Sequence, residues 1–212
     1  MPLALGCSGV TCWRRPRDWQ AAGVWRRLHR VLLKLLQGAG LLDWHRASID
    51  SATVPAKAGG GATGPSPVDS GKPDTRRRLL VDAGGTPLGV ALSPANRHDS
   101  KMLAETLDAV PPVRGRPGRP RSRPGKLHAD KAYDHRRCRS ECRRRGIALR
   151  IARRGVESSA RLGRHRRMVE RTLAWLSRFR RLAIRYERNA DIHLALTTLA
   201  CAVICLKRAK RF

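Results

Sequence analysis

Apolar residues recur at helical spacing near both ends of the chain. Within residues 19–42 they alternate with basic residues and form one stripe: Val24, Leu28, Val31, Leu32, Leu35 and Leu36. This pattern predicts a helix that ends near Gly38–Gly40, because glycine is favoured just past the end of a helix. Near the other end, Ile192–Leu206 contains no Asp, Glu, Lys or Arg. It is shorter than the roughly 20 apolar residues of a membrane span and includes His193, so it predicts a buried helix over residues 192–209.

Between these ends the pattern changes to short stretches typical of strands. Five of them have β-branched or largely apolar residues: Ala47–Val54, Arg77–Asp82, Leu88–Leu92, Leu127–Asp130 and Ile147–Ile151. The second and third flank Ala83–Pro87, whose Gly-Gly pair and proline predict the turn of a hairpin. Three further helices are predicted over residues 98–110, where Asp99 or Ser100 can provide the cap, 136–145 and 166–181. This order of elements predicts an α/β fold, a mixed sheet flanked by helices.

Two polar segments interrupt this pattern. Gly59–Lys72 is rich in Gly, Pro and Ser and predicts a loop. Residues 111–126 form a Pro/Arg/Gly tract with almost no apolar content, which predicts a mobile basic insert. We therefore expect an N-terminal helical segment over residues 1–42 and one α/β domain over residues 43–212 that carries the insert.

The chain is strongly basic. Its 45 Lys and Arg residues against 16 Asp and Glu residues give a formal net charge of +29. A charge of this sign attracts polyanions, and nucleic acid is the commonest polyanion that a soluble protein meets. Binding to a membrane surface usually requires a concentrated basic amphipathic helix, whereas here the basic residues run along the whole chain. The composition indicates a polyanion partner and no membrane, and it does not by itself indicate an enzyme.

The six cysteines indicate small apolar side chains in a reducing compartment. Cys138 and Cys142 are four residues apart, as are Cys201 and Cys205, so each pair of thiols shares one helix face. Neither pair has the spacing of a zinc ribbon or finger, and the first residues lack a secretory signal. We expect a cytoplasmic protein without a structural metal at these cysteines.

Three acids stand out in so basic a chain. Asp50 lies inside a predicted strand, where Asp is disfavoured, and Asp130 ends another strand, where ligands of α/β sheets commonly bind. Glu170 lies on the side of its predicted helix opposite the apolar face. Each acid alone has a structural explanation, an edge strand or turn for Asp50 and an ion pair with Arg166 for Glu170. Together, three carboxylates can converge on two Mg²⁺ ions about 3.5–4 Å apart, as phosphodiester chemistry requires.

Seven blocks of sequence, in order, resemble the bacterial insertion-sequence DDE transposases of the IS5 group (IS4/IS5-like). The blocks are Ser48–Ser51, Gly64–Pro73, Leu80–Ala83, Ala95–Ser100, His128–Asp134, Val169–Leu176 and a seventh in three pieces, Arg178–Leu182, Ile184–Arg188 and Asp191–His193. The first two resemble the first catalytic block of that family, the next two its connecting blocks, and the last three its second and third catalytic blocks. The resemblance extends over nearly everything from Trp13 onward, and several spaced blocks are far more specific than one motif.

This resemblance implies an RNase H-like fold for residues 43–212 and a transposase that cleaves and transfers DNA strands. It implies that Asp50, Asp130 and Glu170 are the catalytic, metal-binding triad. The implied cofactor is Mg²⁺, with Mn²⁺ as an alternative, in the form of two ions. The implied partners are the DNA of the element ends and of the target, and the implied assembly is a homodimer or a higher synaptic multimer.

The family pattern Tyr-x2-Arg-x3-Glu-x6-Lys is matched in part. Arg166 stands at the Arg and Glu170 at the Glu, whereas Gly163 stands at the Tyr and Ser177 at the Lys. Helical spacing places Arg166 on the same face as Glu170, as expected of a side chain that contacts phosphate. The expected DNA contacts are Arg166, Arg178, Arg181 and Lys131, with Arg178 or Arg181 as a replacement for the missing lysine.

Two further interpretations stay open at this level. Family members usually carry another N-terminal region before the segment that contains Trp13, so a chain that begins at Met1 is expected of a second reading frame or a truncated copy. The first alternative is therefore a catalytically silent remnant that only binds DNA. A basic RNA-binding protein of the ribosomal type would explain the charge but would leave the three acidic blocks unexplained.

Overall fold

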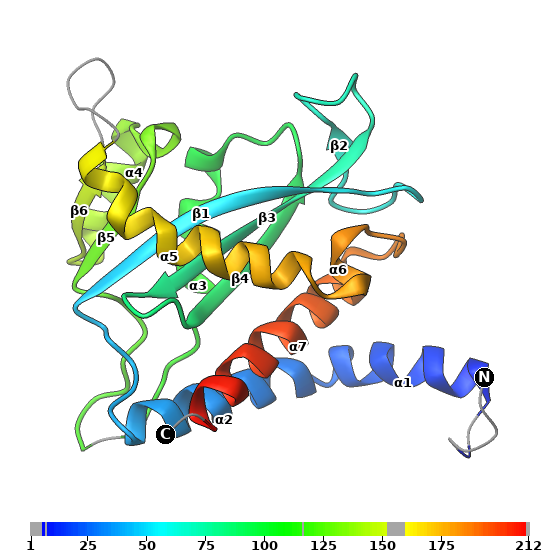
Figure 1. Ribbon diagram of the computed structural model, residues 1–212, viewed down its shortest axis with the longest axis horizontal. Helices are drawn as coiled ribbons and strands as arrows, with labels where there is room; N and C mark the ends of the chain where they lie inside the picture. The colour runs from blue at the N-terminus through cyan, green and yellow to red at the C-terminus, as the bar shows by residue number, and fades with distance from the viewer. Residues whose placement is uncertain (1–5, 7, 116, 152–159, 211–212) are drawn as a thin grey trace.

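The centre of the molecule is one mixed β-sheet. The computed structural model describes residues 6, 8–115, 117–151 and 160–210, without the side chains of 160–165. The strands follow the order β4-β3-β1-β5-β6 across the sheet, and Figure 1 shows them side by side. Their bounds are Arg46–Pro55 for β1, Pro73–Asp82 for β3, Pro87–Pro94 for β4, Lys126–Ala129 for β5 and Ala148–Ile151 for β6. A two-residue strand, β2 (Gly64–Pro65), pairs with the first residues of β3.

The pairing directions identify the architecture. Strand β3 runs antiparallel to both β1 and β4, while β5 runs parallel to both β1 and β6. Only β3 therefore opposes the direction of the other four long strands, and the two parallel pairs are joined by helical crossovers. The sheet confirms the predicted fold class, an RNase H-like mixed sheet flanked by helices.

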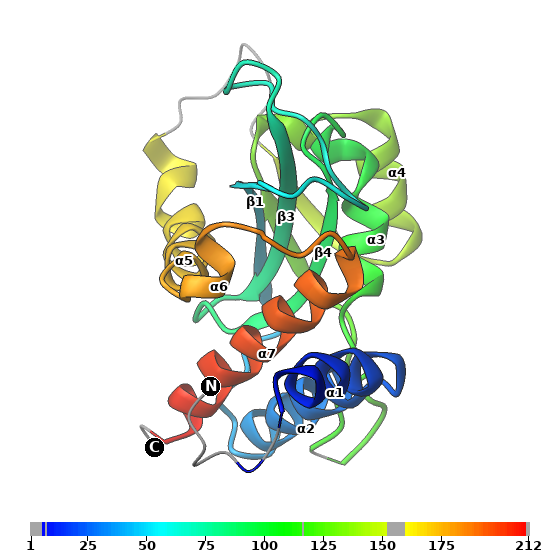
Figure 2. The same cartoon turned by 90° about the vertical axis from the view of Figure 1, so that its right-hand side faces the viewer.

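Helices cover both faces of the sheet. Figure 2 shows α5 and α6 on one side of it and α3 and α4 on the other, and α7 packs against β4 and against α2. Two single turns of 3₁₀ helix, η2 and η3, precede α3 and follow β5. The bounds are Asp99–Lys101 for η2, Leu103–Asp108 for α3, Lys131–Tyr133 for η3, Arg136–Arg144 for α4, Ala160–Ser177 for α5, Arg180–Ala183 for α6 and Ala190–Ala209 for α7.

The strand alternation divides the apolar core between the two faces. Successive side chains of a strand point to opposite faces, so Leu79 and Val81 pack against α5, whereas Leu80 packs in the cluster on the other face. On β1, Ile49 belongs to the cluster on the face opposite α5, and Ala52 belongs to the cluster beneath α5. The even-numbered positions of β1, which include Asp50, therefore face α5.

The N-terminal stretch forms two helices rather than one. Helix α1 (Gly9–Ala21) and helix α2 (Val24–Gly38) meet at Gly23, whose φ of 68° suits glycine. The end of α2 agrees with the prediction. The predicted single apolar stripe was wrong, because its residues divide between the two sides of the helix. Leu32 and Leu36 are buried, whereas Leu28, Val31 and Leu35 are exposed.

Two local predictions were wrong. The cap of the helical turn at residue 99 is His98, whose Nδ1 accepts the Ser100 N–H at 3.2 Å, rather than Asp99 or Ser100. The described part of segment 111–126 is attached to the domain rather than a mobile insert. Val113 is buried and pairs with Arg121, and Gly115 lies so close to α2 that a Cβ there would come within 2.6 Å of a backbone oxygen. A single well-placed valine anchors a segment that composition alone marks as flexible.

The C-terminal helix is largely internal, as predicted. Helix α7 is long and apolar enough to cross a membrane, but half of its apolar window is buried inside the fold. Cys201 and Cys205 lie in that buried part, and Cys138 and Cys142 are buried on α4. All four are free thiols, which agrees with their interpretation as small apolar side chains.

Candidate active site

Strand register brings Asp50 and Asp130 to neighbouring positions. In the parallel pair of β1 and β5, Ser48 lies opposite His128. Two residues further along each strand are Asp50 and Asp130, the latter just past the end of β5. In-register residues of parallel strands point to the same face and are about 4.8 Å apart at Cα. The sheet itself therefore places these two carboxylates side by side beneath α5.

Backbone hydrogen bonds hold one oxygen of each carboxylate. Asp50 Oδ1 accepts the N–H of Ser51 at 2.8 Å, and Asp130 Oδ1 accepts the N–H of Ala132 at 3.0 Å as the cap of η3. Burial raises the pKa of Asp130, and the nearby charge of Asp50 raises it further. Two partly buried carboxylates of like charge disfavour each other's ionisation, and a bound cation relieves that cost.

Arg166 provides positive charge between the acids. Its Nη2 lies 3.2 Å from Asp50 Oδ2 and 3.4 Å from Glu170 Oε1. Burial is the largest influence on the Arg166 guanidinium and acts to lower its pKa, but Asp50, Asp130 and Glu170 together leave that pKa raised. One guanidinium thus forms ion pairs with Asp50 and Glu170 and also lies in the electrostatic field of Asp130.

The acids are not gathered into a finished metal site. No group of three His, Cys, Asp or Glu side chains within the described residues is close enough to hold a metal ion. The side chain of Glu170 is 51 % exposed, against 13 % for Asp50, and its only ion pair within the described part of the chain is with Arg166. Carboxylate oxygens are the hard ligands that Mg²⁺ prefers, so the donor set fits the ion. The triad stays a prediction.

The residues expected to contact DNA occupy four different settings. Lys131 is exposed in η3, directly after Asp130. Arg181 forms an ion pair with Glu187, so its charge is already partnered. Arg178 is exposed beyond the end of α5, and Arg166 lies among the acids described above.

The departures from the family pattern have one visible consequence. Ser177, which stands at the pattern's lysine, accepts a hydrogen bond from Nη2 of the fully buried Arg77 at 3.3 Å. A lysine at this position would place a second positive charge against a buried guanidinium, which Coulomb repulsion disfavours. The surroundings of Gly163 lie outside the described residues.

A buried ionic network beside the acids escaped prediction from the sequence. Asp99 Oδ1 accepts a hydrogen bond from Arg78 Nε at 2.8 Å, and Asp99 Oδ2 accepts one from Ser51 Oγ at 3.2 Å. Arg78 is fully buried, and the sequence indicates only a basic strand there. The network ties η2 to β1 at the residue next to Asp50, so it positions that part of the strand.

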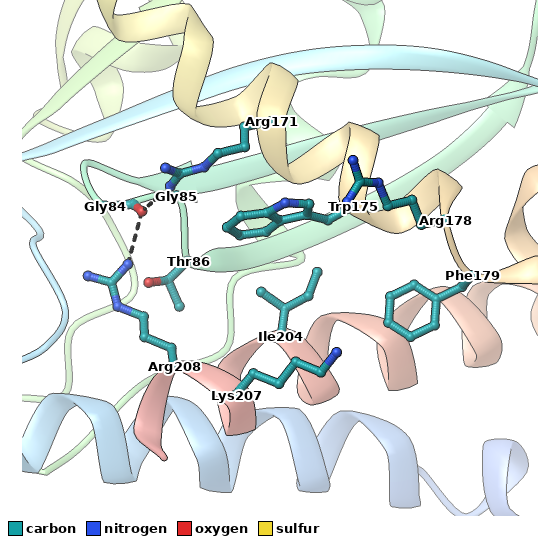
Figure 3. Close-up of a pocket in the computed structure, with 10 residues that line it drawn as sticks. All are labelled: Gly84, Gly85, Thr86, Arg171, Trp175, Arg178, Phe179, Ile204, Lys207 and Arg208. Carbon is teal, nitrogen blue, oxygen red and sulfur yellow. Dashed lines mark hydrogen bonds between the residues drawn. The ribbon is translucent and has the colours of Figure 1, made fainter. Parts of the chain in front are cut away.

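The sequence also did not predict a hollow of about 670 Å³ between α5, the β3–β4 turn and α7, which we call the basic cavity. Figure 3 shows Trp175 of α5 and Phe179, the residue that precedes α6, turned toward Ile204 of α7. Among the residues that the structure describes, four cations and no acid line the cavity: Arg171, Arg178, Lys207 and Arg208. The spacing of Arg171, Trp175 and Arg178 along one helix was the only available signal, and α7 supplies the other wall from a distant part of the chain.

Comparison with known proteins identifies the family of this chain. Residues 45–205 match the family model described as "Transposase DDE domain". The putative transposase for insertion sequence element IS402 of Burkholderia cepacia is 46 % identical over 149 residues, which are 70 % of this chain and 71 % of that protein. An uncharacterized 16.2 kDa protein of the same element and organism is 53 % identical over 68 residues, which are 32 % of this chain and 46 % of that protein. Among solved structures, the catalytic core domain of BIV integrase has a TM-score of 0.43 at 14 % identity, over 79 % of this chain and 97 % of that chain.

Proposed function

We propose that this chain, which belongs to the family of transposase DDE domains, binds its catalytic metal ions with Asp50, Asp130 and Glu170. The family cleaves and transfers DNA strands and uses divalent metal ions. The observation that carries the assignment is the place of Arg166, a single cation in ionic contact with Asp50 and Glu170 and within the field of Asp130. A position that three carboxylates make favourable for one positive charge is favourable for metal ions as well.

We assign Mg²⁺ to this site, as two ions, with Mn²⁺ as a substitute. Two such ions activate the attacking oxygen and stabilise the departing 3′-oxygen of the DNA strand. Asp50 and Asp130 provide ligands from the rigid sheet, whereas Glu170 provides its ligand from the exposed face of α5. The backbone hydrogen bonds to Asp50 Oδ1 and Asp130 Oδ1 fix both carboxylates in place, which keeps the reacting phosphate and the nucleophile aligned.

We assign the DNA phosphates around the site to the surrounding cations. With metal bound, the acids no longer need the Arg166 guanidinium, which then lies free to donate hydrogen bonds to a phosphate. Lys131 is exposed beside Asp130 and extends this contact, and Arg178 and Arg181 lie further along the same side of the sheet. The net charge of +29 steers the DNA of the element ends and of the target toward the protein.

Three finer assignments follow from the same proposal. We assign the chain to the IS5 group from the resemblance of its ordered sequence blocks, and we assign it to the cytoplasm as a soluble protein that acts on DNA. The synapsis of two DNA ends requires at least two copies, so we assign a homodimer or a higher multimer. The remnant that only binds DNA is not favoured, because the chain keeps the acids in a common setting and belongs to the enzyme family.

The test is DNA cleavage by the purified chain in Mg²⁺ or Mn²⁺. Asp130→Asn removes one negative charge with little change of shape, so cleavage should fall by about a thousandfold or more while DNA binding persists. Asp18→Asn is the matched control, because Asp18 is an exposed residue of α1 paired only with Arg17 in the described part of the chain. Cleavage that survives Asp130→Asn at the rate of the control would overturn the triad.

A further inference from the structure

The basic cavity has the features of a binding site, and the proposed triad does not account for them. It lies beside the part of α5 that follows Glu170, where Arg171 and Trp175 belong to the helix and Arg178 directly follows its last residue. Its volume of about 670 Å³ falls within the roughly 300–1,000 Å³ typical of sites for small ligands. The aromatic rings of Trp175 and Phe179 and the side chain of Ile204 give it an apolar floor, and cations form its rim (Figure 3).

The cations of the rim divide into two fixed and two available side chains. Arg171 Nη2 and Arg208 Nη1 both donate to the carbonyl oxygen of Gly84 at 2.9 Å, and Arg208 Nη2 donates to that of Leu41 at 3.2 Å. Among the described residues neither guanidinium forms an ion pair with a carboxylate, although Arg208 lies close enough to the buried Asp82 to lower the pKa of that acid. Arg178 and Lys207 are exposed, and their side chains make no hydrogen bond or ion pair within the described part of the chain. The cavity therefore presents an excess of positive charge that an anionic ligand can neutralise.

The turn between β3 and β4 is shaped to admit these arginines. A Cβ on Gly84 would lie 2.4 Å from the Arg208 guanidinium, and a Cβ on Gly85 would lie 2.8 Å from that of Arg171. Gly85 also has a φ of +86°, which L side chains rarely adopt. The two glycines thus let two guanidinium groups pack directly on the backbone at the mouth of the cavity.

Trp175 gives the cavity a stacking surface. The Arg171 guanidinium carbon lies 4.7 Å from the centroid of the Trp175 ring, so one cation already stacks on the indole. Trp175 is only partly buried, even though it belongs to a helix that packs on the sheet. Aromatic rings beside a track of cations are the pattern by which proteins bind unpaired nucleotides, with the base on the ring and the phosphate on the cations.

We infer that the basic cavity binds an unpaired nucleotide of a DNA strand, with its base against Trp175 and Phe179 and its phosphate between Arg178 and Lys207. This inference rests on the proposed function, because the same α5 carries Glu170 at the cleavage site and Arg171 at the mouth of the cavity. Binding here needs no metal ion, since the charges that meet the phosphate belong to the protein.

The first experiment measures the binding of a fluorescein-labelled (dT)₁₀ oligonucleotide by anisotropy, in EDTA. The double variant Arg178→Gln/Lys207→Gln should weaken binding about tenfold and reduce the salt slope by about 0.7 for each phosphate that the protein no longer neutralises. The matched control Arg30→Gln/Lys34→Gln removes the same charge from exposed positions of α2 and should change affinity less than about twofold. Equal reductions of affinity in the two double variants would overturn the site, because they would reflect net charge alone.

The second experiment tests the stacking surface. Trp175→Leu should weaken the oligonucleotide by about fivefold or more, whereas Trp175→Phe, which keeps an aromatic ring, should retain most of the affinity. Quenching of tryptophan fluorescence by the oligonucleotide should be lost in Trp175→Phe and kept in Trp13→Phe, an exposed ring of α1. If polyglutamate displaced the oligonucleotide equally well and Trp175→Leu had no effect, the cavity would take acidic peptide, and the nucleotide would be excluded.

The two proposals fail separately. Asp130→Asn protein should bind (dT)₁₀ with wild-type affinity, because the acid lies outside the cavity. Loss of cleavage in Asp130→Asn together with unchanged oligonucleotide binding in Arg178→Gln/Lys207→Gln would keep the triad and exclude the nucleotide site. The reverse result would keep the nucleotide site and exclude the triad.

Discussion

Helix α5 carries two regions of opposite electrostatic character. Around Arg166 and Glu170 negative charge is in excess, and one guanidinium serves three carboxylates. Around Arg171 and Arg178, one to two turns further along, positive charge is in excess and no acid lines the cavity. In a chain of net charge +29, the second setting is the ordinary one, and the first exists only because the sheet places Asp50 and Asp130 side by side.

The difference shows how one helix can serve two partners. The acidic region is complementary to cations, and its own Arg166 partly satisfies it. The basic cavity is complementary to anions, and backbone carbonyls orient two of its four cations without neutralising them. A DNA strand with its metal ions presents both kinds of charge, so the two regions are complementary to successive parts of one ligand.

The strongest way to separate the two regions is to change adjacent residues of α5. Glu170→Gln should lower metal-dependent cleavage by about a thousandfold or more and leave (dT)₁₀ binding unchanged. Arg171→Gln should weaken (dT)₁₀ binding several-fold, because Arg171 stacks on Trp175, and leave the cleavage rate at saturating DNA near that of the wild type. If both variants lost both properties together, α5 would carry one site rather than two.

A change in the core beneath α5 should affect both regions at once. Leu176 is fully buried in the apolar cluster beneath α5, to which β3, β4 and α7 also contribute. Leu176→Ala should therefore lower the free energy of unfolding by about 2–5 kcal/mol. Thermal and denaturant unfolding measure this loss, and Ala174→Ser, an exposed position of the same helix, is the control. A stable Leu176→Ala protein would contradict the assignment of this contact to the core.

Arg166 competes with metal ions for the acids. Arg166→Gln removes its two ion pairs with Asp50 and Glu170, which are partly exposed and together contribute about 1 kcal/mol. Without DNA, Mn²⁺ should therefore bind the variant about fivefold more tightly, by electron paramagnetic resonance. Weaker Mn²⁺ binding in the variant would show that Arg166 supports the metal site instead of competing with it.

The smallest expected effect concerns the hairpin that borders the basic cavity. His29 of α2 is bonded to the Pro87 carbonyl at 2.9 Å, and burial lowers its pKa from 6.5 to about 4. The unfolded chain therefore binds a proton that the folded chain excludes, and stability is lost as the pH falls from about 6.5 toward 4. Lowering the pH from 7 to about 5.5 should cost about 1 kcal/mol from this residue.

His29→Gln should flatten that dependence in urea unfolding followed at several pH values, because glutamine can keep a hydrogen bond and does not titrate. His193 has its pKa lowered to about 4 as well, so part of the dependence should persist in the variant. A pH dependence identical to that of the wild type would contradict the role of His29.

Local patterns predicted most of the elements because their causes are local. The β-branched ends of Ala47–Val54 and the Gly-Gly turn at Gly84 specify strand and hairpin through backbone preferences alone. The same reasoning missed the burial of Val113, since it depends on packing against distant residues, and it missed the break at Gly23, where a single glycine adopts a φ of 68°. Hydrophobic spacing placed α2 but not its orientation, because exposed and buried leucines look alike in a sequence.

The sequence by itself determined the polyanion partner, the α/β class and the identity of the three candidate acids, because charge, periodicity and ordered motifs are properties of the chain. Only the tertiary structure decided that Asp50 and Asp130 follow the parallel pairing of Ser48 with His128, and that Arg166 lies within the electrostatic influence of all three acids. It also decided that α5, α7 and the β3–β4 turn enclose a cavity lined by four cations. These features join residues far apart in the chain, and only packing brings such residues together.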